Sequence, residues 1–137
     1  MHSDRSTAPR FLLCLPSGPM AVPIAREFVH VLDFWTDPED IDDVELIVSE
    51  LVTNAVRHGS STTQCVELRM SAAPSGVSGS VKDEGRVTFR LSNATPLVDR
   101  PGGFRLFIAR TLADTLEVES SPAGNTVHFT VASRDRA

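Results

Sequence analysis

The sequence predicts an α+β domain in which helices pack on one face of a mixed β-sheet. Residues 21–35 and 38–58 each repeat apolar side chains at helical spacing, and the two segments are close neighbours in the chain. A short apolar run precedes this helical pair, and segments in which apolar and polar residues alternate follow it; both patterns are typical of strands. We expect the order strand, two helices, two strands, helix and two strands, with four to five strands in a single sheet.

A polar N-terminus precedes the first strand and the first helix. Residues 1–10 are expected to form a flexible N-terminus. Phe11–Leu15 is a short apolar run closed by a Pro-Ser-Gly-Pro sequence, which predicts a strand followed by a turn. Residues 21–35 are expected to form the first helix, and Pro23 is tolerated there because it lies near the helix start.

The second helix, over residues 38–58, has signals at both ends. Asp37 suits the capping position and Pro38 suits the first helical position. Gly59 is of the type that commonly follows a helix end. The apolar face of this helix is expected to consist of Ile41, Val44, Val48, Leu51 and Ala55.

The second half of the chain is predicted to supply the other strands. Cys65–Met70 alternates with a period of two and predicts a strand. Residues 71–85 are rich in Ser, Gly and Pro and are interpreted as a flexible hairpin loop. The remaining expected elements are a strand over Val87–Leu91, a helix over 103–114, strands over Leu116–Glu119 and Val127–Val131, and a C-terminal tail over 132–137.

Composition indicates one globular domain. The chain has 137 residues, of which 41% are hydrophobic and 23% charged. A net charge of −5 argues against a nucleic-acid partner, because no dense basic patch is present to bind phosphates. No segment has the length of a membrane span, so a cytoplasmic protein is expected. Cys14 and Cys65 are interpreted as two reduced, buried thiols.

Two polar residues mark the second helix as a candidate site. Glu50 and Asn54 lie one turn apart beside the apolar face, so they can address one ligand. Spacing alone leaves open an ordinary amphipathic helix with a solvated polar edge.

The residue identities around this pair carry a family resemblance. Glu50-x-x-x-Asn54-Ala55-x-x-His58-Gly59 resembles the N-box of the GHKL ATPases, and SELVTNAVRHG resembles the anti-sigma-factor serine kinases among them. The resemblance covers residues 11–131 and implies a histidine-kinase-like (Bergerat-type) ATPase sandwich that binds ATP and Mg²⁺. It implies that Glu50 is the catalytic general base, that Asn54 ligates the magnesium, and that His58 belongs to the nucleotide site.

The downstream nucleotide boxes match this family unevenly. Asn93 stands where the resemblance implies an Asp that accepts a hydrogen bond from the adenine amine; it is either a weakened ligand or a turn residue. Gly102 and Gly103 match the phosphate-binding glycines, but Arg105 replaces the third. Arg105 either occludes the phosphates or contacts them. Gly124-Asn125-Thr126 resembles the family's Gly-x-Thr strand entry, which implies Thr126 at the cofactor site; a hairpin turn accounts for the same residues.

Two functions are therefore predicted. The first is an anti-sigma-type regulator that binds ATP and phosphorylates a serine of an anti-sigma antagonist. The second is a degenerate family member that acts as a protein-binding module with weak or no ATP binding. Both imply a sigma factor or its antagonist as partner, and the resemblance also implies a possible homodimer.

Overall fold

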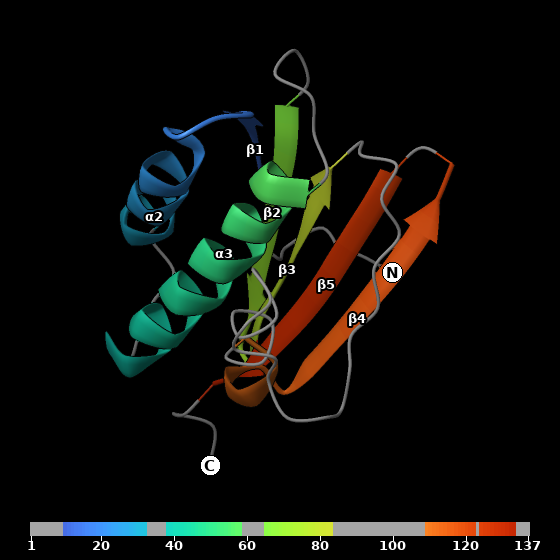
Figure 1. Ribbon diagram of the computed structural model, residues 1–137. Helices are drawn as coiled ribbons and strands as arrows, with labels where there is room; N and C mark the ends of the chain where they lie inside the picture. The colour runs from blue at the N-terminus through green and yellow to red at the C-terminus, as the bar shows by residue number, and fades with distance from the viewer. Residues whose placement is uncertain (1–9, 33–37, 59–64, 84–108, 123, 134–137) are drawn as a thin grey trace, which may run out of the picture.

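A computed structural model describes residues 10–32, 38–58, 65–83, 109–122 and 124–133 (Figure 1). Five strands form one sheet in the order β1-β2-β3-β5-β4, and two helices cover one of its faces. Residues 109–112 form a further helical turn just before β4. The strands are β1 (Arg10–Pro16), β2 (Cys65–Ala73), β3 (Gly76–Asp83), β4 (Thr115–Ser121) and β5 (Gly124–Ala132), and the helices are α2 (Ala21–Val31) and α3 (Pro38–His58).

The predicted α+β class with helices on one face is confirmed, and the described strands form an antiparallel sheet rather than the mixed one that was predicted. All four pairings between the described strands are antiparallel. The tight turn between Ala73 and Gly76 accounts for one of them, because a connection this short can only join antiparallel strands. The predicted strand over Val87–Leu91 and most of the predicted helix over 103–114 lie outside the described residues.

The predicted flexible loop over residues 71–85 is wrong, because most of this segment is sheet. β2 continues to Ala73, and β3 begins at Gly76. Val77 and Val81 are buried toward the helices, whereas the serines between them lie on the other side. Serine and glycine weaken the strand signal in the sequence. β3 nevertheless forms a strand because it pairs by hydrogen bonds with β2 on one edge and with β5 on the other.

Gly79 in β3 is required by close packing rather than by a turn. Its register partner on β5 is Phe129, whose side chain is only 1% exposed. A Cβ atom at position 79 would lie 2.6 Å from Phe129 Cζ, too close for any side chain without a shift. The glycine therefore makes room for the largest buried ring of the core.

The hydrophobic core lies between α3 and the helix-facing side of the sheet. The predicted apolar face of the second helix is confirmed, with only Ile41 partly rather than fully buried. The fully buried side chains that fill this layer include Leu15, Val29, Val44, Ile47, Val48, Val52, Val66, Leu68 and Phe129. Within the residues that the structure describes, no helix is both long and apolar enough to cross a membrane.

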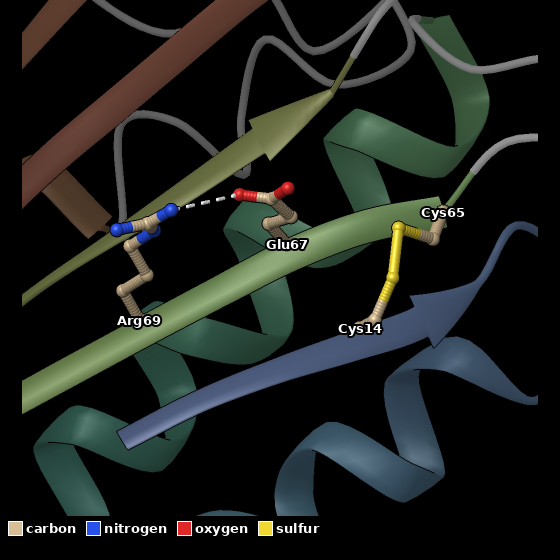
Figure 2. The surroundings of a disulfide bond; sticks show 4 residues. All are labelled: Cys14, Cys65, Glu67 and Arg69. Atoms are coloured by element: carbon tan, nitrogen blue, oxygen red, sulfur yellow. Dashed lines mark hydrogen bonds and ion pairs between the residues drawn. A yellow bond between two sulfur atoms is a disulfide. The ribbon is translucent and has the colours of Figure 1, made fainter. Parts of the chain in front are cut away.

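Cys14 and Cys65 form a disulfide bond between β1 and β2, so the prediction of two reduced, buried thiols is wrong (Figure 2). Their Cα atoms are 5.7 Å apart, although 51 positions separate them in the sequence. The register pairs Cys14 with Glu67 and Pro16 with Cys65, which makes the two cysteines diagonal neighbours on one face. Cys14 is exposed and Cys65 is half-buried, because they lie on the open face, the side of the sheet away from α2 and α3.

Candidate functional site

Glu50 and Asn54 lie in the C-terminal half of α3, one helical turn apart. Glu50 is 7% exposed and Asn54 is 4% exposed, so the alternative of a solvated polar edge is wrong. Ile47 and Leu51 beside them are part of the core. Burying a carboxylate costs free energy unless polar partners or a ligand satisfy it, so this pair marks a polar site at the rim of the core.

Asp83 and Asn125 form a second buried polar pair, on the sheet opposite α3. They are register partners on β3 and β5, and their side chains are 3% and 4% exposed. Lys82 before Asp83 and Thr126 after Asn125 are half-exposed, and the strand alternation puts Asp83 and Asn125 on the helix-facing side with Val81 and Val127. The Ser120 hydroxyl on β4 donates a hydrogen bond of 2.7 Å to Asn125 Oδ1, which fixes the orientation of the amide.

The two polar pairs lie at the same end of the domain. Figure 1 shows the C-terminal end of α3, the end of β3 and the beginning of β5 together at one end of the sheet. α3 packs directly against β3 and β5. Two carboxylates and two amides, Glu50, Asp83, Asn54 and Asn125, therefore line one end of the interface between the helical layer and the sheet.

The donor set at this end suits a magnesium nucleotide. Carboxylate and amide oxygens are hard ligands, and Mg²⁺ is commonly held by one or two protein ligands together with phosphates and water. No group of three or more His, Cys, Asp or Glu side chains with metal-binding geometry occurs among the described residues. Asn54 with ligand phosphates fits this mode better than an all-protein metal cage does.

Thr126 is not brought to this site, contrary to the sequence prediction. In β5 it alternates with the buried Asn125 and Val127, so it lies on the open face, with Lys82 of β3 as its register partner. Asn125 occupies the inward position that Thr126 was expected to occupy. The apolar alternation of β5 carries the signal that sequence analysis missed, because Asn125 shares its phase with Val127, Phe129 and Val131.

His58 is the last residue of α3, one turn beyond Asn54. Asn93, Gly102, Gly103 and Arg105 lie outside the described residues. Their predicted position in a common cleft with Glu50 therefore stays a prediction.

Asp83 was missed because its strand was interpreted as a loop. Once 76–83 is a strand, the alternation of Val77, Gly79 and Val81 places Asp83 on the buried side. A buried carboxylate that ends a core strand and precedes Glu84-Gly85 is then the detectable signal.

A separate groove lies on the open face. It has a volume of about 460 Å³ and runs across β1, β2, β3 and β5. Neither Glu50 nor Asn54 lines it, so it is distinct from the candidate site. Its polar lining includes Arg10, Arg69, Ser71, Ser78, Ser80, His128 and Thr130.

A helical layer over one face of an antiparallel sheet, with a buried Glu and Asn one turn apart on the covering helix, defines the class of histidine-kinase-like ATPase domains. The family described as "Histidine kinase-like ATPase domain" matches residues 15–131. The chain belongs to this family and, within it, to the anti-sigma-factor serine kinase group.

Two curated relatives carry the group's name. Both are called "Anti-sigma F factor", one from Thermoanaerobacter sp. (strain X514) and one from Thermoanaerobacter pseudethanolicus (strain ATCC 33223 / 39E). Each is 30% identical over 112 residues, which cover 75% of this chain and 78% of the relative.

A solved structure supports the fold. The crystal structure of the RsbU and RsbW domains of Rv1364c from Mycobacterium tuberculosis superposes with a TM-score of 0.70 at 23% identity. The match covers 92% of this chain and 33% of that longer chain, so this chain spans about one third of its length.

Proposed function

We propose that this protein is an anti-sigma-type regulator that binds Mg-ATP and transfers the γ-phosphoryl group to a serine of an antagonist protein. The observation that carries the proposal is the burial of Glu50 and Asn54, one turn apart, where α3 meets the end of β3. The two curated anti-sigma F relatives support the regulatory class and suggest a sigma factor or its antagonist as partner.

Glu50 and Asn54 each have a role in this proposal. The Glu50 carboxylate accepts the proton of the attacking serine hydroxyl while the Oγ–phosphorus bond forms and the bond to the ADP leaving group breaks. The Asn54 side-chain oxygen would hold the magnesium ion. When bound, that ion neutralises charge on the phosphates.

We further propose Asp83, in place of Asn93, as the carboxylate that recognises the adenine amine. Asp83 ends β3 on the buried, helix-facing side, at the end of the sheet where α3 carries Glu50 and Asn54. A hydrogen bond to a charged group nets about 1.5–3 kcal/mol, against about 0.5–1.5 for a neutral pair. With Asp83 in this role, an amide at position 93 no longer implies weakened base recognition.

Arg105 supports the second candidate, a protein-binding module that has lost tight ATP binding. It stands at the third glycine of the phosphate-binding sequence, where backbone amides would approach the phosphates. A long side chain at this point weakens that approach unless its guanidinium replaces the backbone as a phosphate ligand.

The test compares the natural chain, Glu50→Gln and Arg105→Gly in two assays. Isothermal titration with Mg-ATP measures binding, and radiolabelled ATP added to native cell lysate measures transfer to serine. We expect Glu50→Gln to bind ATP almost as the natural chain does and to lose transfer, because a general base acts in the transition state.

The alternative gives a different result in the same assays. No binding by the natural chain, together with a gain of binding in Arg105→Gly, would identify the module. Absence of binding in every variant would exclude the nucleotide site altogether.

A further inference from the structure

The Cys14–Cys65 disulfide lies on the open face of the sheet, where a solvent-borne thiol can reach it (Figure 2). Cys14 is an exposed residue of β1, and Cys65 is the first residue of β2. Thiol–disulfide exchange requires a line of approach to one of the two sulfur atoms, so exposure separates labile bonds from permanent ones. On this criterion the bond belongs to the labile class.

The charges beside the bond are compatible with attack by a thiolate. Glu67 is the register partner of Cys14, and its carboxylate would repel an incoming anion. The guanidinium of Arg69, on the same face of β2, lies 3.4 Å from Glu67 Oε1 (Figure 2). The cation of this ion pair partly offsets the negative charge of Glu67 beside the bond.

The bond also holds β1, an edge strand with little buried surface. β1 is an edge strand that pairs with β2 alone among the described strands. Of its seven residues only Leu15 is buried. The Phe11 ring adds an edge-on contact with Phe28 of α2 at 6.4 Å between ring centres. Leu13 is partly buried against the core, so the backbone ladder, two leucines, one aromatic pair and the disulfide are the main attachments of β1.

We propose that Cys14–Cys65 is a site of reversible thiol–disulfide exchange that takes a dithiol as its co-substrate and controls the order of β1. A thiolate of the dithiol bonds to Cys14 Sγ, and Cys65 Sγ leaves as a thiolate. The second thiol of the reagent then attacks the mixed disulfide and releases the Cys14 thiolate. The protein gains two electrons and two protons, and the dithiol becomes a disulfide.

Opening the bond has two structural consequences. β1 supplies Arg10, Phe11 and Leu12 to the groove on the open face, so loosening this strand removes one wall of the groove. β1 also leads through Pro16 and Gly18 directly into α2, which packs against α3. The redox state is thereby connected to the helical layer without a change in Glu50 or Asn54 themselves.

Hydrogen exchange on the full chain tests the proposal. The protein is purified without reductant, reduced with millimolar dithiothreitol, and then reoxidised with oxidised glutathione. At each stage the free thiols are counted by alkylation and mass spectrometry. We expect both cysteines to resist alkylation in the purified protein, to be alkylated after reduction, and to resist alkylation again after reoxidation. Amides of β1 should exchange at least about tenfold faster in the reduced protein, while those of α3 and β5 keep their protection.

The double variant Cys14→Ser with Cys65→Ser provides the permanently open control. It should reproduce the fast β1 exchange of the reduced protein and should not respond to either reagent. A disulfide that dithiothreitol does not reduce in the folded protein would overturn the proposal. So would a rate of β1 hydrogen exchange that is the same in the oxidised and reduced protein. Loss of hydrogen-exchange protection throughout the chain on reduction would show that the disulfide stabilises the whole fold rather than β1 alone, and this result would also overturn the proposal.

Discussion

Asp83 and Asn125 face each other across β3 and β5, and both side chains are buried on the side of the sheet that α3 covers. The pair places an anion and an amide at the end of the sheet nearest the C-terminal half of α3 (Figure 1). Ser120 holds the amide of Asn125 by a hydrogen bond of 2.7 Å to Oδ1. This relationship moves the proposed base-recognition site from the segment around Asn93 to the end of β3.

Asp83→Asn should weaken Mg-ATP binding by about tenfold or more, because a charged hydrogen bond to the adenine amine becomes a neutral one. Asn93→Asp should change affinity little. Isothermal titration of both variants decides between the two positions, with Thr126→Val on the open face as the matched control. An Asp83→Asn protein that binds as the natural chain does, beside a large gain in Asn93→Asp, would return the role to position 93.

α3 could be predicted from the sequence because its signals are local, whereas α2 ends at Val31 and Leu32 is already extended, short of the predicted end at residue 35. α3 repeats apolar residues over its full length and carries its own start signal in Pro38, so its bounds agree with the prediction. β3 lacks such signals, because Ser78, Gly79 and Ser80 are poor strand formers. Its strand conformation depends on partners far along the chain, above all on Phe129, which needs the space that Gly79 leaves.

For the candidate site too, only the residues that lie close together in the sequence could be placed by prediction. Glu50 and Asn54 are encoded within one helix, so their spacing fixes their relation. Asp83 could be placed only after β3 was known to be a strand. The disulfide depends on the pairing of β1 with β2 across two helices, and a sequence separation of 51 gives no sign of that pairing.

Gly79→Ala should destabilise the domain by about 1–3 kcal/mol, because overpacking a filled core forces its neighbours to move. The added Cβ would lie 2.6 Å from Phe129 Cζ and 2.8 Å from the backbone oxygen of Arg69, and the latter cannot turn aside. Urea unfolding measures the loss. Gly18→Ala is the control, since no heavy atom lies within 4 Å of its Cβ position. Equal stability of the two variants would contradict the packing assigned to Phe129.

The contact between α2 and α3 should make stability depend on pH through Glu45. Arg26 Nε donates to Glu45 Oε2 at 2.7 Å, and His30 Nε2 lies 2.8 Å from Glu45 Oε1. The hydrogen bond from Arg26, then that from His30, lower the pKa of Glu45, and partial burial opposes them. Because the folded pKa lies below the unfolded one, this stabilisation is fully present above about pH 4.5 and is lost as pH falls through the folded value.

Glu45→Gln tests this dependence. Because Arg26 is largely exposed, the variant should lose only about 0.5–1 kcal/mol of unfolding free energy at neutral pH. The difference from the natural chain should shrink as pH falls below about 4.5, since protonation then removes the same charge from the natural chain. Urea unfolding across pH 3–7 measures both curves, with Glu27→Gln on the exposed side of α2 as the control. Parallel curves for the natural chain and Glu45→Gln down to about pH 3 would show that the folded carboxyl is not stabilised by Arg26 and His30.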